Sequence, residues 1–332
     1  MQIMRLAVVA AIAMLTASCP SAAADRENPF LKAKNWGYQL RNLEPEPRKV
    51  IANSVYDLVV VDYARGEDRK EIPLTKAEVA EMQKRPDGGK RLVIAYFSIG
   101  ESEDYRYYWK PEWDTKRPSW MGKENKDWKK NFVVEYWNPE WQKILYGSPD
   151  SFIDRIIAAG FDGVYFDRAD AYYFFGDSDL ARGRMVELIN KLAAYAREKN
   201  PKFAIMVQNA EELLERKEFV EVIDGVAKES LLYGIKGLGI PNPRSDIQES
   251  TALLQKASKS GKAIFVVEYV RDKASIATAA KRVNDELGWA LYIGTKGLAT
   301  LAKSPLTPAD PVPDDDDERI GSETKKIVKK KN

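Results

Sequence analysis

The chain contains no histidine and only one cysteine, Cys19, among its 332 residues. Without histidine, the Ser-His-Asp and Cys-His catalytic arrangements are excluded, as is nearly every zinc or non-haem iron site. A single cysteine forms no intramolecular disulfide and cannot ligate an iron–sulfur cluster by itself. The side chains left for chemistry are mainly Asp, Glu, Lys, Tyr, Ser and Arg, so the sequence predicts a protein without metal or other cofactor.

The sequence also lacks an excess of charge of one sign. Its 52 Lys and Arg residues nearly balance 50 Asp and Glu residues, which leaves a net charge of +2. This balance gives no electrostatic reason to expect a nucleic-acid partner. Hydrophobic residues make up 44% and charged residues 31%, which is typical of a soluble globular protein, and we expect a monomer. The 11% of aromatic residues suits sugar binding and equally suits a large core.

The amino-terminal apolar run is too short to cross a membrane. It covers residues 6–15, about half of the ~20 residues that a spanning helix needs. Because it follows Arg5 and precedes small residues at 21–24, we predict a secretory signal peptide over residues 1–24, cleaved after Ala24. The alternative is a lipoprotein signal with the lipid on Cys19. Either reading predicts export, to a secreted or periplasmic location or to a lipid-anchored place in the envelope.

The carboxy-terminal residues 304–332 form a tail of a different composition. Four prolines between 305 and 313 precede an acidic block at 314–317 and a lysine-rich end at 325–331. Proline followed by blocks of like charge predicts a disordered tail. Residues 28–303 remain as one domain, close to the ~250 residues of a single (β/α)8 barrel.

Short apolar runs alternate with helical patterns along this domain. Runs such as 58–61 and 264–267 are typical of parallel strands that are buried on both faces. Helical stripes lie between such runs, for example Met185, Leu188 and Leu192. The expected strands are 35–40, 58–63, 91–98, 163–167, 203–208, 225–228, 263–269 and 289–293. This alternation favours an α/β fold, a (β/α)8 TIM barrel, over an open doubly wound sheet, whose G-x-G-x-x-G signature is absent.

One connection is too long for an ordinary link between strand and helix. Residues 101–139 follow the third predicted strand and are rich in Trp and Tyr. We predict that this stretch is an excursion whose aromatic rings stack on sugar. The alternative is that the same rings seal the barrel or form a lid.

Polar residues end nearly every predicted strand. In a (β/α)8 barrel the carboxyl ends of all strands open onto one face, where catalytic residues lie. A ring of acids, amides and tyrosines at that face indicates a metal-independent glycoside hydrolase. Such an enzyme needs one carboxyl group to protonate the departing oxygen and a second to attack the anomeric carbon or activate water. The residues in these positions are Gln39, Asp62, Tyr63, Ser98, Glu101, Asp167, Arg168, Gln208, Asn209, Glu229, Ser230, Glu268 and Tyr269.

Each of these carboxylates also has a structural reading. An Asp at such a junction often caps the next helix. Asp62 could brace a tyrosine or an arginine, and Glu103 could hold Arg106. Asp162 precedes its strand, at the end of the barrel that stabilises the fold, and we interpret it as structural.

Six sequence motifs in this order resemble the family 114 glycoside hydrolases, the endo-α-1,4-polygalactosaminidase-like barrels. They are W-G-Y-Q-L at 36–40, Y-D-L-V-V-V-D-Y at 56–63, the stretch from I-A-Y-F-S to D-Y-R at 94–106, G-F-D-G-V-Y-F-D at 160–167, Q-N-A-E-E-L at 208–213 and K-E-S at 228–230. Single motifs are weak, but the ordered set covers almost the whole predicted domain and is specific.

The resemblance implies a (β/α)8 fold and an exported, endo-acting hydrolase that cleaves α-1,4-linked galactosamine-containing polysaccharide without a metal. It implies a catalytic pair, with Asp167 as nucleophile and Glu229 as acid/base. The residues that would line the sugar pocket are Tyr38, Asp62, Tyr63, Glu101, Asn209 and Tyr269. A cleft rich in Asp and Glu would attract a polymer that bears free amines. The alternative function is a non-catalytic polysaccharide-binding barrel.

Overall fold

Eight parallel strands pair in a single curved sheet in a computed structural model that describes residues 26–66 and 71–310. The expected signal peptide and Cys19 lie outside these ranges. In order, the strands are β1 (Trp36–Gln39), β2 (Leu58–Asp62), β5 (Leu92–Ser98), β9 (Gly163–Asp167), β10 (Ala204–Gln208), β11 (Gly225–Glu229), β14 (Ala263–Glu268) and β15 (Ala290–Ile293). Each predicted strand matches one of these within one residue at either end.

The two edge strands, β1 and β15, meet across a seam that closes the barrel. The indole N–H of Trp36 lies 3.3 Å from the carbonyl oxygen of Val266 and 3.2 Å from that of Ala290. Beyond the strand ends, the backbone N–H of Leu40 donates to the carbonyl of Leu298 at 2.8 Å. The sheet is therefore a nearly closed barrel, which confirms the predicted single (β/α)8 fold.

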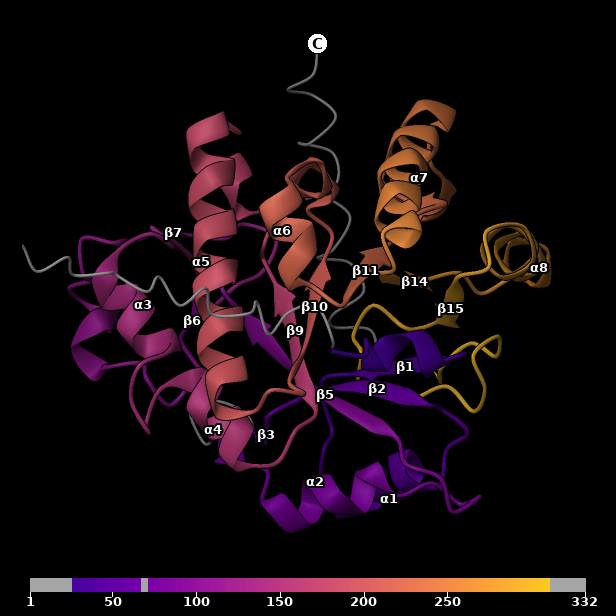
Figure 1. Cartoon of the computed structure of the whole chain (residues 1–332), viewed down its shortest axis with the longest axis horizontal. Helices are drawn as coiled ribbons and strands as arrows, with labels where there is room; N and C mark the ends of the chain where they lie inside the picture. The colour runs from indigo at the N-terminus through magenta and orange to yellow at the C-terminus, as the bar shows by residue number, and fades with distance from the viewer. Residues whose placement is uncertain (1–25, 67–70, 311–332) are drawn as a thin grey trace, which may run out of the picture.

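Helices surround the strands and bury the outer face of the sheet (Figure 1). The longest, α5, begins after Ser178, whose side chain accepts a hydrogen bond from the N–H of Ala181 as an N-cap. The predicted stripe at Met185, Leu188 and Leu192 is fully buried. The helices are α1 (Pro45–Ala52), α2 (Lys76–Gln83), α3 (Pro139–Leu145), α4 (Phe152–Ala158), α5 (Asp179–Lys199), α6 (Lys217–Val222), α7 (Arg244–Lys259) and α8 (Lys273–Ala280).

A short turn near the amino terminus closes the end of the barrel opposite the carboxyl ends of the strands. Phe30 is fully buried, and its ring lies 5.9 Å from that of Phe265 in an edge-on contact. A Cβ on Gly225, at the start of β11, would lie 3.1 Å from the Phe30 ring, so glycine leaves room for this plug. Because the amino-terminal end is filled, the open face of the barrel is the one at the carboxyl ends of the strands.

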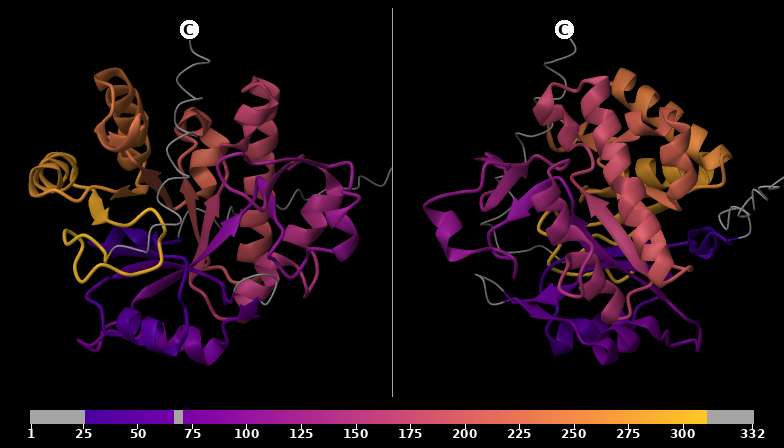
Figure 2. Two further views of the ribbon diagram at one scale, coloured as in Figure 1. Left: turned by 180° about the vertical axis from the view of Figure 1, so that it is seen from behind. Right: turned by 60° about the vertical axis from the view of Figure 1, so that its left-hand side comes forward.

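The excursion after β5 folds into a small antiparallel sheet of its own. Its strands are β6 (Glu101–Glu103), β7 (Met121–Glu124) and β8 (Asn131–Val134), and we call residues 101–134 the insertion. It projects from the barrel in the rotated views (Figure 2). The rings of Trp113 and Trp120 lie 5.5 Å apart, and both are nearly buried. Many of its aromatic residues therefore build a local core within the insertion.

The packed chain continues past the predicted domain end at residue 303. The N–H of Ile293 donates to the carbonyl of Pro305 at 2.8 Å, and the side chain of Arg271 donates to the carbonyl of Ala309 at 2.9 Å. Ala309 is buried. The rest of the predicted tail, from residue 311, lies outside the described residues. Among the described helices, none has the length and apolar character needed to span a bilayer.

Candidate active site

A cavity of about 1250 Å³ lies at the carboxyl ends of the barrel strands. Strand-end residues of β1, β2, β5, β9, β10 and β11 line it, together with residues 124 and 127–131 of the insertion. Arg168, Asn209 and Ser230 each directly follow a barrel strand and have φ angles of 59°, 52° and 54°. This left-handed conformation is uncommon for residues other than glycine. Its occurrence after three neighbouring strands marks the mouth of the barrel as a specialised region.

Asp167 ends β9 and accepts a hydrogen bond on each carboxylate oxygen. The hydroxyl of Tyr96 donates to Oδ2 at 2.5 Å, and the backbone N–H of Arg168 donates to Oδ1 at 2.7 Å. Burial raises the pKa of Asp167 to about 7, while the Arg168 charge and the Tyr96 hydrogen bond act to lower it. The carboxyl is thus fixed in orientation and changes its charge near neutral pH.

Glu229 ends β11 and lines the same cavity. The side-chain amide of Gln208 donates to Oε2 at 2.7 Å, and the hydroxyl of Tyr269 donates to Oε1. The backbone N–H of Glu229 donates to Oδ1 of Asn209 at 3.1 Å. Two donors on one carboxylate fix its orientation, so the second predicted catalytic group is as firmly held as the first.

Tyr38 lies beside both carboxyl groups. Its side chain lines the cavity, and its ring lies 5.1 Å from the ring of Tyr165. Burial raises the pKa of the Tyr38 hydroxyl, and the nearby Tyr165, Glu229 and Asp167 add to the effect. The hydroxyl is therefore neutral and can donate a hydrogen bond to a ligand in the cavity.

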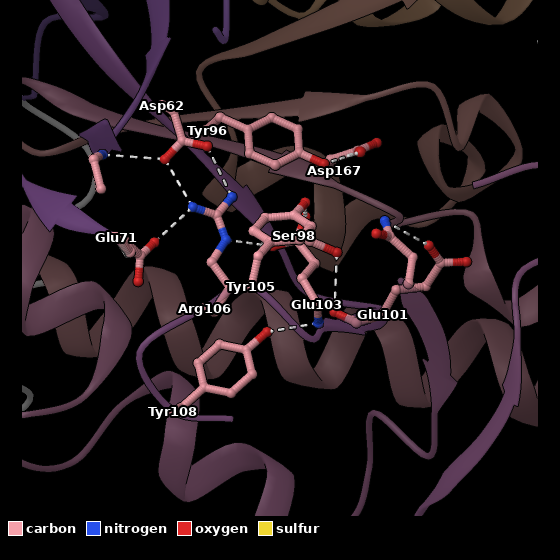
Figure 3. Close-up of polar contacts among 12 residues, drawn as sticks. Asp62, Glu71, Tyr96, Ser98, Glu101, Glu103, Tyr105, Arg106, Tyr108 and Asp167 are labelled. Carbon is pink, nitrogen blue, oxygen red and sulfur yellow. Dashed lines mark hydrogen bonds and ion pairs between the residues drawn. The ribbon is translucent and has the colours of Figure 1, made fainter. Parts of the chain in front are cut away.

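Asp62 lines the cavity but is paired with a buried arginine (Figure 3). Nη1 and Nη2 of Arg106 lie 2.8 Å and 2.9 Å from the two oxygens of Asp62. Arg106 also contacts Glu71 at 2.9 Å and Glu103 at 2.6 Å. Burial raises the pKa of Glu103, and Arg106 opposes this shift. The bracing role considered for Asp62 and the pairing considered for Glu103 are both present.

Glu101 also lines the cavity, although its side chain is 0% exposed. Its Oε1 lies 3.0 Å from Nη2 of Arg168 and 2.9 Å from the amide nitrogen of Asn125. A carboxylate so enclosed holds neighbouring protein groups in place. Its predicted direct contact with sugar is therefore not favoured by this geometry.

Two predicted pocket residues do not line the cavity. Tyr63 is fully buried, with its ring 4.7 Å from that of Phe152 under the helices. The reason is alternation, because successive side chains of an extended chain face opposite sides, and Asp62 takes the inner one. Tyr269 contacts the site through the hydrogen bond that its hydroxyl donates to Glu229. The structure thus brings Tyr38, Asp62, Glu101, Asp167, Asn209 and Glu229 to one cavity.

Sequence reasoning missed several residues of the cavity. Tyr96 lies two residues before Ser98, so the period of a strand places both on one face, and this signal was available. Lys228 lines the cavity and pairs with Glu211 at 2.8 Å. Trp128 lines it from the insertion, and no local pattern distinguishes this ring from those that build the insertion core.

The lining of the cavity is acidic despite the nearly neutral chain. Thirteen Asp and Glu side chains line it, against eight Lys and Arg. Among the described residues, no group of three or more His, Cys, Asp or Glu side chains is arranged to hold a metal ion. The cavity therefore offers a negative field, which favours a cationic ligand.

Comparison with known proteins identifies relatives along most of the chain. The model of glycoside-hydrolase family GH114 matches residues 16–306. An uncharacterised protein of Methanocaldococcus jannaschii is 37% identical over 268 residues, which cover 78% of this chain and 73% of that protein. An uncharacterised protein of Deinococcus radiodurans is 35% identical over 276 residues, which cover 83% and 85%.

Two solved structures have the same fold. The glycoside hydrolase domain of PelA from Pseudomonas aeruginosa aligns with a TM-score of 0.58 at 18% identity, covering 80% of this chain and 95% of that domain. Ega3 of Aspergillus fumigatus, solved in complex with galactosamine, aligns with a TM-score of 0.54 at 17% identity, covering 84% and 94%.

Proposed function

The chain belongs to glycoside-hydrolase family GH114, and on this basis we propose that it is an endo-acting hydrolase of α-1,4-linked galactosamine-containing polysaccharide. The observation that carries the proposal is the pair of carboxyl groups of Asp167 and Glu229. They end two barrel strands, line one cavity and are each oriented by two hydrogen-bond donors. Hydrolysis of a glycosidic bond needs two such groups and neither histidine nor metal.

In the proposed reaction Glu229 gives its proton to the departing glycosidic oxygen while the Asp167 carboxylate attacks the anomeric carbon. In the second step Glu229 takes a proton from a water molecule, whose oxygen attacks the anomeric carbon, breaks its bond to Asp167 and leaves Asp167 as a carboxylate. Tyr96 and the Arg168 N–H keep the Asp167 oxygens in place through both steps. The neutral Tyr38 hydroxyl can donate to a sugar oxygen held between the two groups.

The charge of the cavity supports an amino-sugar substrate. A polymer of galactosamine carries ammonium groups near neutral pH, and an acidic lining raises its local concentration. The galactosamine in the Ega3 structure is a further support for this class of sugar. We propose no metal, other cofactor or nucleic acid as a partner. Activity that persists in excess chelator is expected, and its loss would contradict a metal-independent mechanism.

We propose that the protein is exported, because exopolysaccharide lies outside the cell. The support is the sequence of residues 1–24. Mass spectrometry of the mature amino terminus distinguishes cleavage after Ala24 from a lipid on Cys19. An unprocessed chain that starts at Met1 would contradict export by either route.

The alternative is a barrel that binds polysaccharide without cleaving it. Incubation of the purified protein with α-1,4-galactosamine polymers of differing N-acetylation distinguishes the two functions. We expect oligosaccharides of several lengths early in the reaction, as an endo-acting enzyme produces. Binding by calorimetry to the same polymers with no product at any protein concentration would favour the non-catalytic barrel.

A further inference from the structure

Arg168, the residue directly after Asp167, is held by the insertion as well as by the barrel. We infer that Arg168 is a positioning residue for Asp167, fixed by Glu101 so that its backbone N–H and its charge both act on the Asp167 carboxylate. The inference rests on the proposed function, since it assigns how one of the two reacting carboxyl groups is prepared.

The backbone of Arg168 takes a conformation that arginine adopts only at a cost. Its φ angle is 59°, in the left-handed region that favours glycine and, less strongly, asparagine. This conformation accompanies the 2.7 Å hydrogen bond from its N–H to Oδ1 of Asp167. A Cβ on Gly100 would lie 2.3 Å from the Arg168 carbonyl oxygen, so the residue directly before the insertion packs closely on this peptide.

The side chain of Arg168 is fixed by a buried carboxylate. Nη2 lies 3.0 Å from Oε1 of Glu101, whose side chain is 0% exposed. Asn125, in the turn between β7 and β8, donates to the same oxygen at 2.9 Å. The guanidinium also lies over the ring of Phe174, with its central carbon 5.2 Å from the ring centre. The insertion therefore supplies the polar groups, Glu101 and Asn125, that hold this cation next to the reacting carboxyl.

The charge of Arg168 has a definite effect on Asp167. Burial raises the pKa of this carboxyl, and Arg168 is the strongest group acting against burial. Tyr96 lowers the pKa through its hydrogen bond, while Asp170 and Glu229 raise it. The titratable and charged groups that face Asp167 are Tyr38, Tyr96, Tyr165, Arg168, Asp170 and Glu229. Because Arg168 is the one cation in this set, its removal shifts the carboxyl toward its protonated form.

Two substitutions separate the charge of Arg168 from its backbone. Arg168→Asn removes the charge but suits the left-handed conformation. Arg168→Lys keeps the charge and a donor that can still pair with Glu101, and it loses only the planar guanidinium. The double variant Arg168→Asn with Glu101→Gln avoids an unpaired buried carboxylate if the single variant folds poorly. Arg282→Gln, which removes an exposed partner of Glu286 outside the cavity lining, is the matched control.

The readouts are the pH dependence of kcat/KM on a galactosamine polymer and the pKa of Asp167 from carbon-13 NMR of its carboxyl, with Asp167→Asn for assignment. We expect Arg168→Asn and the double variant to raise this pKa, and the acidic limb of kcat/KM, by about one pH unit. Arg168→Lys and Arg282→Gln should show the same Asp167 pKa and the same acidic limb of kcat/KM as wild type.

An Asp167 pKa that is unchanged in folded Arg168→Asn and in the double variant would overturn the inference. So would an equal shift in Arg168→Lys, because the charge is kept there. The NMR measurement needs no substrate. If wild type cleaves none of the polymers, the proposed function fails while the test of Arg168 still stands.

Discussion

The hydroxyl of Tyr96 on β5 donates a 2.5 Å hydrogen bond to Oδ2 of Asp167 on the neighbouring strand β9. Both side chains line the cavity at the open face of the barrel. The contact fixes one oxygen of the carboxyl and favours its charged form, against the burial that raises its pKa to about 7. The charge of Asp167 is therefore set by opposing effects, and its titration lies in an accessible pH range.

The first prediction concerns the pH dependence of wild type. In its proposed role as nucleophile Asp167 must be ionised, so we expect kcat/KM to rise with pH through about 7 in the free enzyme. Tyr96→Phe removes a donor that favours the charged form, and this limb should move to higher pH. Steady-state rates between pH 5 and 9 measure both. If kcat/KM instead falls through pH 7 as Asp167 loses its proton, Asp167 is the acid and the assigned roles are reversed.

The barrel was predictable because its signals are local. Each barrel strand is a short apolar run that must be buried on both faces, so its ends could be placed within one residue. Asp167 and Glu229 could be placed at the open face because they end two such runs. The ordered motifs then supplied the proposed catalytic roles of these two residues, which composition could not.

The insertion and the orientation of strand-end residues were not predictable in the same way. β6, β7 and β8 pair through contacts between residues far apart in sequence, and such pairing leaves little trace in any short window. Tyr63 was assigned to the pocket as a strand-end residue of the family motif, yet alternation along the strand turns its side chain outward. Arg106 pairs with Asp62 although the two residues lie 44 positions apart in the sequence, and only the folded structure shows this contact.

The second prediction is a loss of stability in Arg106→Met. Arg106 is buried among Asp62, Glu71 and Glu103, and its removal leaves three carboxylates without their cation. We expect the free energy of unfolding to fall by about 3–5 kcal/mol, measured by urea denaturation. Arg282→Gln breaks a pair whose side chains are 40% and 44% exposed and should cost less than about 1 kcal/mol. Equal losses in the two variants would refute the importance of this cluster.

The third prediction concerns Glu268, a buried carboxyl at the end of β14. Burial raises its pKa from 4.5 to about 8, and the backbone N–H of Leu232 donates to it at 2.7 Å. The folded state holds the Glu268 proton that the unfolded state releases, so this group costs stability as pH rises from 4.5 through 8. Glu268→Gln keeps an acceptor for Leu232 and avoids that cost.

The melting temperature of Glu268→Gln relative to wild type should therefore increase between pH 5 and pH 9, by roughly 5–10 °C. Glu286→Gln, at an exposed position, is the control and should show no such trend. A relative melting temperature that stays level over this range would contradict a titration of Glu268 between pH 5 and pH 9.

The fourth prediction tests whether aromatic rings of the insertion contact sugar. Trp128 lines the cavity, whereas Trp137 packs on Phe175 at 4.6 Å and does not. Trp128→Ala should raise KM for the polymer roughly threefold to tenfold with little change in kcat, because it removes binding and no reacting group. Trp137→Ala should lower the melting temperature and leave KM as in wild type. The same KM for Trp128→Ala and wild type would place that ring outside the substrate path.

The central claim is that the carboxyl groups of Asp167 and Glu229 together cleave a galactosamine polymer. The most direct measurement is oligosaccharide release from α-1,4-linked polygalactosamine by wild type, Asp167→Asn and Glu229→Gln, each shown to be folded by its melting curve. We predict release by wild type and a loss of at least about 10³-fold in each variant. Turnover close to wild type in either variant would contradict the claim.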